Sequence, residues 1–398
     1  MLRRTLEKKL RLSASQYPVV SLTGPRQSGK TTLVRNVFAE YDYVSLEHPE
    51  QRAFALEDPK GFLGQFRGKV ILDEVQRTPE LFSYIQPLVD ERDAPGQFIL
   101  TGSQNFLLLR NISQTLAGRC AILHLLPLAL HELQERPPFP LEDLGRKIPP
   151  QAQKATETLF DLLFRGFYPR IYDKKLDPQD WLRNYHQTYL ERDVRDLANV
   201  GDLEVFSRFV RLCAGRNGQL LNLSSLSVDC GVSHTTARRW LSILEASFLV
   251  VLLRPHFQNF NKRLVKTPKL YFLDTGLLCY LLRIPSAEEL RFHPHRGAIF
   301  ESFVVSEFFK NFLHQGLEPG LFFWRDSSGH EVDLLVEKGS ALIPVEIKSG
   351  ETLNPDFFAG IDYWRKLAAQ PQGPAALVYA GEESYKRREV GVYSWKEL

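Results

Sequence analysis

The chain has 398 residues, a formal net charge of +3 and 43% hydrophobic residues, a composition that is ordinary for a globular protein. Its length is too great for one hydrophobic core, so we expect two to four domains. The four cysteines form no CxxC pair, which argues against a zinc ribbon and against a disulfide framework. No apolar run approaches the roughly 20 residues of a membrane-spanning helix, and no secretory signal is recognisable. We therefore expect a cytoplasmic protein without a membrane partner.

The first part of the chain alternates short strand-like runs with helical patterns. We expect strands at 17–22, 43–46, 70–72 and 97–100, and a helix at 30–38. This alternation is typical of an α/β fold in which a parallel sheet is flanked by helices. Because such sheets bind ligands beyond the carboxyl ends of their strands, the residues that follow each strand are the first candidates for a site.

Residues 24–31, GPRQSGKT, fit the pattern GxxxxGKT and lie between a predicted strand and a predicted helix. Glycines let the backbone approach phosphate groups, and the N-terminus of the helix favours negative charge. We expect Lys30 to reach the β- and γ-phosphates of ATP and Thr31 to ligate Mg²⁺. The predicted contacts of the cofactor in this loop are Gly24, Pro25, Arg26, Gln27, Ser28, Gly29, Lys30, Thr31 and Thr32.

The run VILDE at 70–74 supplies the second half of a nucleotide site. Its apolar residues predict a buried strand, and the acidic pair follows at the carboxyl end of that strand. We expect Asp73 to bind Mg²⁺ and Glu74 to activate the attacking water as a general base. Some fifty residues after a phosphate-binding loop, this pair predicts ATP hydrolysis.

Two further sets of residues could complete the ATP site. In FILTGSQN at 98–105, Thr101, Ser103 or Asn105 could sense the γ-phosphate, or could simply be the polar end of a buried strand. In LAGRC, Arg119 follows a glycine. A guanidinium group there could stabilise the transition state on a neighbouring subunit's ATP, or could form a surface salt bridge.

The middle of the chain reads as a connector followed by a small helical domain. A proline-rich stretch at 135–151 interrupts the α/β alternation, and residues 152–212 have helical spacing. Residues 223–245 read as a helix–turn–helix, with Gly231 in the turn and Ser233 as the N-cap of the second helix. The strand-like segments after it would form the wing of a winged helix.

The predicted winged helix carries positive charge. Between residues 246 and 273 there is no acidic residue, whereas Arg254, Lys262, Arg263, Lys266 and Lys269 fall inside this segment. Such a surface could contact DNA phosphates, or the module could pack internally as a protein contact. The residues expected to bind DNA are Arg238, Arg239, Lys262, Arg263 and Lys266.

The last hundred residues return to an α/β alternation, with a helix near 297–314 and strands at 321–325, 331–336 and 341–347. In this region, the order E…D…ExK of four residues resembles the restriction-endonuclease-like superfamily. Those residues are Glu301, Asp333, Glu346 and Lys348. The resemblance implies that the three carboxylates hold a second Mg²⁺ or Mn²⁺ and that the lysine supports attack on a phosphodiester. The alternative is a nuclease-like fold that does not cleave.

The motifs GPRQSGKTTL, VILDEVQ, LTGSQN and LAGR together resemble the AAA+ family of ATPases, in the prokaryotic branch that carries a C-terminal domain of unknown function. The resemblance extends over FRGFYPRIY (164–172), TYLERDV (188–194) and KTPKLYFLDTGLL (266–278). It implies a ring of subunits, typically a hexamer, with an arginine finger at Arg119 and with Arg192 and Arg195 as rivals. The usual sensor asparagine is ambiguous here, because Ser103 stands where the strand ends.

We therefore expect an α/β protein of four domains. They are an ATPase core at 1–134, a helical connector at 135–212, a winged helix at 213–290 and a restriction-endonuclease-like domain at 291–398. The expected function is ATP-driven binding and remodelling or processing of branched or duplex DNA, with metal-dependent cleavage as an open addition. The alternative is a nucleotide-controlled switch or scaffold that remodels proteins.

Overall fold

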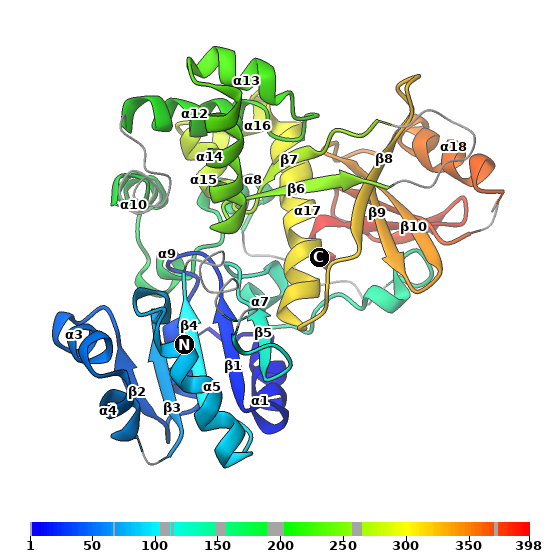
Figure 1. Ribbon diagram of the computed structural model, residues 1–398. Coiled ribbons are helices and arrows are strands. Elements are labelled where there is room, and N and C mark those ends of the chain that lie inside the picture. Colours follow the sequence, from blue (N-terminus) through cyan, green and yellow to red (C-terminus); the bar gives the residue numbers. More distant parts are fainter. Residues whose placement is uncertain are drawn as a thin grey trace. The chain divides into compact units, whose positions relative to one another are not determined.

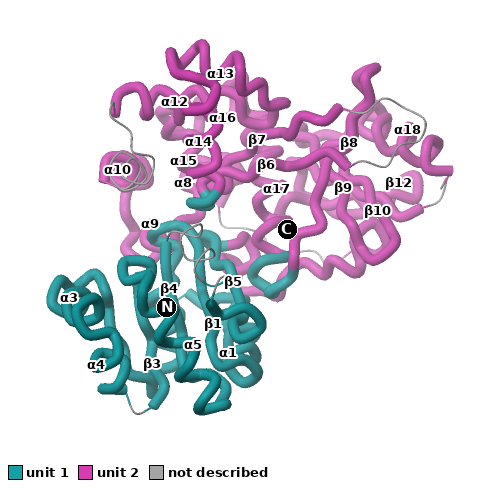
Figure 2. Tube along the Cα trace, viewed as in Figure 1, with its two compact units in different colours: residues 1–128, 246–248, 312–317 teal, residues 129–245, 249–311, 318–398 magenta. Residues whose placement is uncertain are grey.

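The computed structural model describes residues 2–66, 68–103, 112, 115–148, 157–188, 203–256, 265–369 and 373–398. The chain divides into two compact units (Figure 2). Unit 1 consists of Met1–Leu128, Ala246–Phe248 and Phe312–Leu317, and unit 2 of Ala129–Glu245, Leu249–Asn311 and Glu318–Leu398. The four-domain division stays a prediction. Among the described residues, no helix has both the length and the apolar character that crossing a membrane requires.

Unit 1 is built on a five-stranded parallel sheet in the order β2-β3-β4-β1-β5 (Figure 1). The strands are β1 (Val19–Thr23), β2 (Asp42–Ser45), β3 (Val70–Asp73), β4 (Phe98–Gly102) and β5 (Cys120–His124). The helices are α1 (Leu6–Gln16), α2 (Lys30–Val37), α3 (Pro49–Glu57), α4 (Pro59–Gly64) and α5 (Leu81–Arg92), with a 3-10 turn at Val75–Arg77. The predicted α/β alternation is confirmed.

The three central strands of this sheet, β1, β3 and β4, are buried on both faces, which explains why their sequences are mostly apolar. Successive strand residues point to opposite faces. Ile99 therefore packs in a cluster with side chains of α1 and α2, whereas the next residue, Leu100, packs with side chains of α4 and α5. In the sheet order, β4 lies between β1 and β3. The carboxyl ends of these three strands are thus neighbours, and the predicted ATP residues follow them.

Unit 2 contains a helical part and a mixed sheet. Its first helices are α7 (Leu130–Leu133), α8 (Leu159–Arg165), α9 (Pro169–Lys174), α10 (Pro178–Tyr185) and α12 (Leu203–Gly215). The later helices are α13 (Leu223–Cys230), α14 (His234–Ala246), α15 (Thr275–Leu281), α16 (Ala287–Phe292), α17 (Arg296–His314) and α18 (Ala359–Leu367). The predicted helix–turn–helix corresponds to α13 and α14. Asn222 caps α13, and Gly231, with φ of 76°, ends it in the left-handed region.

The sheet of unit 2 has the order β12-β13-β11-β10-β9-β8-β6-β7. Its strands are β6 (Val250–Pro255), β7 (Lys269–Phe272), β8 (Leu321–Arg325), β9 (Glu331–Lys338), β10 (Ala341–Lys348), β11 (Ala376–Tyr379), β12 (Tyr385–Arg387) and β13 (Val390–Ser394). The helix expected near 297–314 and the three strands expected after it are confirmed as α17, β8, β9 and β10.

The expected wing differs from the structure in one respect. Its two strands do pair with each other, as antiparallel β6 and β7. However, β6 also pairs with β8, so the hairpin continues the C-terminal sheet. Lys269 of β7 is 4% exposed, which rules it out as part of a basic surface. The identification of a winged helix stays a prediction.

Candidate active site

The loop between β1 and α2 has a backbone that only glycine can follow at two points. Gly24 has φ of 153°, and a Cβ atom placed on it would lie 2.1 Å from the carbonyl oxygen of Leu125. Gly29 precedes α2 with φ of 92°, in the left-handed region that favours glycine. A loop of this kind at a helix N-terminus directs backbone N–H groups towards a phosphate.

Lys30 is held against this loop. Its side chain is buried, and Nζ donates to the carbonyl oxygens of Gly24 and Pro25, each at 2.9 Å. Burial lowers the pKa of Lys30 to about 8, although nearby Glu74 and Asp73 raise it. The Oγ atom of Ser28 is buried and has no hydrogen-bond partner in the described part of the chain. A phosphate group would give the Ser28 hydroxyl its partner and the Lys30 ammonium group a counter-charge, so the loop fits the phosphates of ATP.

Asp73, at the end of β3, is buried and accepts hydrogen bonds from three hydroxyl groups. Oγ1 of Thr31 lies 3.1 Å from both carboxylate oxygens of Asp73. The hydroxyl of Tyr43 lies 2.9 Å from Oδ2, and Thr101 donates to Oδ1. The structure thus brings Thr31 and Asp73 together, and Thr101 holds the Asp73 carboxylate. Burial raises the pKa of Tyr43 to about 12, as does Asp73, so the phenol stays a donor.

Glu74 directly follows the strand and has φ of 57°, an uncommon left-handed conformation for a residue with a side chain. Oγ of Ser103 donates to its Oε2 atom at 3.1 Å, and Nε2 of Gln76 donates to the same oxygen. Ser103 comes from the end of β4, so two neighbouring strands fix the carboxylate. This placement beside Asp73 suits a base that orients a water molecule. Asn105 lies outside the described residues.

Two arginines predicted for this site, Arg26 and Arg119, have acidic partners at the surface. Arg26 lies 3.8 Å from the carboxylate of Glu47. Arg119 forms two hydrogen bonds with Asp90 of the same chain, from Nε to Oδ1 at 2.5 Å and from a terminal nitrogen to Oδ2 at 2.9 Å. The hydrogen bond from Arg119 lowers the pKa of Asp90. The salt bridge is the alternative that the sequence left open, and a role in trans would require Asp90 to release Arg119. Arg192 and Arg195 lie outside the described residues.

Sequence reasoning missed Arg4. Its guanidinium group is buried and donates to the carbonyl oxygens of Ser28 and Leu126, each at 2.7 Å. These partners lie 24 and 122 residues away in the chain. Arg4 therefore fastens the phosphate-binding loop from the side of the N-terminal segment. A basic residue before a helix gives no local signal of such a contact.

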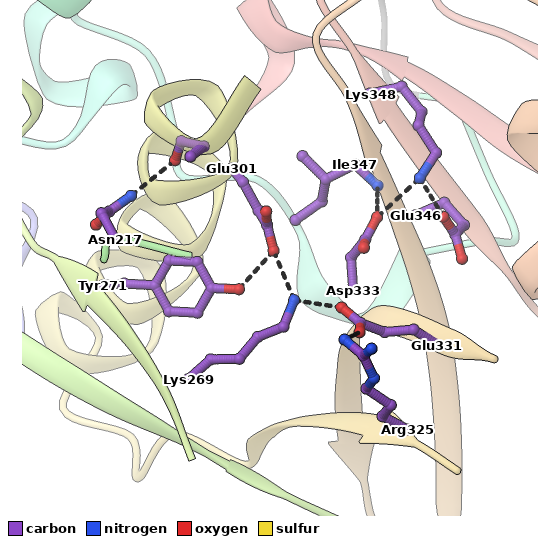
Figure 3. A network of polar contacts seen from close by, with 11 residues as sticks. Asn217, Lys269, Tyr271, Glu301, Arg325, Glu331, Asp333, Glu346, Ile347 and Lys348 are labelled. Carbon is purple, nitrogen blue, oxygen red and sulfur yellow. Dashed lines mark hydrogen bonds and ion pairs between the residues drawn. The ribbon is translucent and has the colours of Figure 1, made fainter. Parts of the chain in front are cut away.

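In unit 2, the four residues of the E…D…ExK order lie close together (Figure 3). The Nζ atom of Lys348 is 3.1 Å from Oδ2 of Asp333 and 2.5 Å from Oε2 of Glu346. The backbone N–H of Ile347 donates to Asp333 at 2.8 Å. Glu346 and Lys348 share a face of β10, as the period of a strand requires. The structure thus places these residues together, and their role as a site stays a prediction.

A second lysine enters this cluster from β7. The Nζ atom of Lys269 lies 3.1 Å from Oε1 of Glu301 and forms an ion pair with Glu331 (Figure 3). The hydroxyl of Tyr271 also donates to Oε1 of Glu301, at 2.5 Å. Burial lowers the pKa of Lys269, but the carboxylates around it outweigh burial and raise the pKa overall. For Glu346, burial and the neighbouring Asp333 raise the pKa well above its usual range.

Sequence comparisons agree with the geometry of unit 1. Residues 16–134 match an AAA domain, residues 156–288 match a domain of unknown function (DUF8612), and residues 296–398 match another (DUF4143). Uncharacterized protein Rv2008c of Mycobacterium tuberculosis is 34% identical over an alignment of 388 residues, and the alignment covers 96% of this chain and 81% of that protein. Uncharacterized protein Mb2031c of Mycobacterium bovis matches to the same extent. The chain belongs to this family of AAA-class P-loop ATPases with a C-terminal DUF4143 domain.

Two solved structures align with this AAA ATPase at low TM-scores. The Walker-type ATPase PABY2304 of Pyrococcus abyssi is 16% identical with a TM-score of 0.38, covering 71% of this chain and 96% of that chain. The RuvB Holliday junction branch migration motor of Thermotoga maritima is 20% identical with a TM-score of 0.30, covering 62% of this chain and 88% of that chain. TM-scores of this size are too low to carry a function from one protein to another.

The two metal sites predicted for the AAA ATPase differ in how well their residues fit Mg²⁺. At the ATP site, the Thr31 hydroxyl and the Asp73 carboxylate are oxygen ligands of the kind that Mg²⁺ prefers, and the ion would neutralise charge on the phosphates. In unit 2, no group of three or more His, Cys, Asp or Glu among the described residues could hold a metal ion. The second Mg²⁺ or Mn²⁺ expected at Glu301, Asp333 and Glu346 is therefore unsupported, and Lys269, which the ExK order does not include, already contacts Glu301.

The residues expected to bind DNA fall into two groups. Arg238 and Arg239 are exposed on α14, and Lys266 is exposed just before β7. None of these three forms an ion pair with another described residue. Lys262 and Arg263 lie outside the described residues. Arg254 of the same basic segment is also exposed, on β6.

Proposed function

We propose that this AAA ATPase binds DNA through the exposed face of α14 and uses ATP hydrolysis to remodel the bound DNA. The observation that carries the proposal is the pair Arg238 and Arg239, exposed and without ion-pair partners in the described part of the chain. Ser233 caps the start of this helix, with Oγ accepting from the N–H of Thr236 at 3.1 Å. The arginines thus lie in the first two turns of the second helix of a helix–turn–helix, the part that enters a groove in such modules.

The opposite face of α14 explains why these arginines stay outside. Four apolar residues of the helix are buried, and they share one stripe at helical spacing. They are Ala237, Trp240, Leu241 and Leu244. The ring of Trp240 packs edge-on against Phe206 and Phe209 of α12. The helix is therefore anchored by one face, and the arginine face is available to a partner rich in phosphate.

The proposed ATP cycle assigns one task to each residue of the phosphate site. The loop backbone and Lys30 bind the phosphates, and Thr31 with Asp73 would hold Mg²⁺. Glu74, fixed by Ser103, orients the water that attacks the γ-phosphate. Subunits assemble into a ring, a hexamer in our proposal, so that Arg119 leaves Asp90 and reaches the phosphates bound by the next subunit.

DNA binding is tested by fluorescence anisotropy with duplex and branched DNA at several salt concentrations, with and without ATP. The double variant R238Q/R239Q should weaken binding to both DNAs and reduce the slope of log K against log [salt] by about 2, since each lost phosphate contact contributes roughly 0.9. The matched control is R387Q/R388Q, an adjacent exposed pair at the end of β12. E74Q should keep the ATP-bound affinity while ATP turnover stops. Equal binding by R238Q/R239Q and R387Q/R388Q would refute the role of α14.

A second candidate is a nucleotide-controlled switch that remodels proteins. One observation favours it: β6 and β7 belong to the C-terminal sheet, so the segment after α14 is committed to internal packing. In this case DNA binding is weak and insensitive to salt. Turnover of ATP that persists together with absent DNA binding would favour this candidate over the first.

A further inference from the structure

The acidic cluster of unit 2 is compensated by cations of the chain itself. Lys348 contacts Asp333 and Glu346. Lys269 contacts Glu301 and Glu331, and the latter also accepts from a terminal nitrogen of Arg325 at 2.8 Å. Each of the four carboxylates is therefore within hydrogen-bond distance of a lysine ammonium group. Lys348 contacts Oδ2 of Asp333 and Oε2 of Glu346, whereas Oε1 of Glu346 is buried and has no hydrogen-bond partner in the described part of the chain. What opposes a metal ion is therefore the positive charge that Lys269 already places among these carboxylates.

The two lysines differ in origin. Lys348 belongs to the ExK order, and a lysine beside these carboxylates is what that order implies. Lys269 belongs to β7, in the segment that matches DUF8612 rather than DUF4143. Its side chain extends from β7, at the end of the sheet order, towards the carboxylates of α17 and β9 (Figure 3). Lys269 is not one of the residues of the E…D…ExK order.

We propose that Lys269 is the resident cation of this cluster, held between Glu301 and Glu331 in place of a divalent metal, so that the C-terminal domain binds no catalytic metal. Its side chain is only 5% exposed, and the side chains of Glu301 and Glu331 are 19% and 20% exposed. A metal ion that displaced the ammonium group would leave it buried without its counter-charges, which is costly. A metal ion that left it in place would meet a like charge within a few ångströms.

The contacts of Lys269 also connect three elements of unit 2. The hydroxyl of Tyr271, two residues further along β7, binds the same oxygen of Glu301 as Lys269 does. The cluster therefore fastens β7 to α17 and, through Glu331, to β9. The inference is independent of DNA binding by α14, because it concerns the cation of the C-terminal cluster alone.

The test is nucleotide-free Mn²⁺ binding by the full chain, followed by electron paramagnetic resonance and by the melting temperature with and without Mn²⁺. Removing the ammonium group in K269M should create one Mn²⁺ site, with affinity raised at least about tenfold over the wild type. Adding D333N to K269M should abolish the gain. The matched control, K266M, replaces an exposed lysine of the same segment and should bind no more Mn²⁺ than the wild type.

Two results would overturn the inference. In the first, the wild type binds Mn²⁺ and D333N abolishes this binding, which would mean that a metal ion displaces or tolerates Lys269. In the second, folded K269M binds Mn²⁺ no more tightly than the wild type, which would mean that Lys269 is not the group that excludes the metal ion. Far-UV circular dichroism and retained ATP turnover establish that the variant is folded. If K269M fails this control, K269Q carries the same test, because glutamine can still donate to the carboxylates but carries no charge.

Discussion

The guanidinium group of Arg4 donates a 2.7 Å hydrogen bond to the carbonyl oxygen of Ser28, the residue before Gly29 of the phosphate-binding loop. The same group binds the carbonyl oxygen of Leu126, so Arg4 bridges the loop and the segment after β5. The loop is thereby restrained from outside the motif that defines it.

Replacing Arg4 with alanine should weaken ATP binding. A hydrogen bond from a charged group contributes about 1.5–3 kcal/mol, so we expect KM for ATP to rise by about tenfold or more, with a smaller fall in kcat. R4K should also be impaired, because an ammonium group lacks the planar fork that reaches two carbonyls. The control is R3A, since Arg3 is exposed. Unchanged ATP kinetics in R4A would show that the loop holds its shape without this bridge.

ATP binding should take up a proton above pH 8. Burial lowers the pKa of Lys30 to about 8, so the ammonium group of the nucleotide-free protein is largely neutral at pH 9. The phosphates favour the charged form and raise this pKa, which requires a proton to bind. Titration calorimetry in two buffers of different ionisation enthalpy should show uptake approaching about one proton at pH 9 and little at pH 6.5. K30M should show no uptake from this group. Equal uptake at both pH values would contradict the prediction.

The hydroxyl of Tyr43 should contribute to Mg²⁺–ATP binding through Asp73. It donates to Oδ2 at 2.9 Å, and it comes from β2, which no ATPase motif marks. Y43F keeps the ring and removes one neutral donor, a loss of about 1 kcal/mol. We expect the Mg²⁺ concentration for half-maximal ATP turnover to rise roughly fivefold. Y84F is the control, since Tyr84 is 42% exposed on α5. An equal rise in the half-maximal Mg²⁺ concentration for Y84F and Y43F would show that the effect does not depend on the hydrogen bond to Asp73.

Arg119 and Asp90 form a pair whose two members should respond differently to substitution. If Arg119 acts on a neighbouring subunit, R119A loses ATP turnover by about a thousandfold, whereas D90A frees the arginine and keeps or increases turnover. If the pair is a surface salt bridge, both variants keep turnover and change the melting temperature little, because solvent screens an exposed ion pair. Mixing R119A with E74Q distinguishes the two directly, because only a residue acting in trans restores activity in mixed assemblies.

The ATP site was predictable because its residues lie in continuous motifs. Residues 24–31 and the pair Asp73 and Glu74 each carry their own local pattern, and the parallel sheet brings them together. Arg4 was not predictable, because its partners lie 24 and 122 residues away. Lys269 was misread for the same reason. In the sequence it stands in a basic segment, but its partner Glu301 is 32 residues further along and buries it.

The pairing of β6 with β8 joins the segment that matches DUF8612 to the segment that matches DUF4143 through main-chain hydrogen bonds. A fragment that begins at residue 291 would lose this partner strand. It would leave β8 as an open edge, with unpaired N–H and C=O groups that invite aggregation. A fragment that contains only the C-terminal domain would therefore disturb the sheet that carries the E…D…ExK residues. A fragment that preserves this sheet has to include β6 and β7.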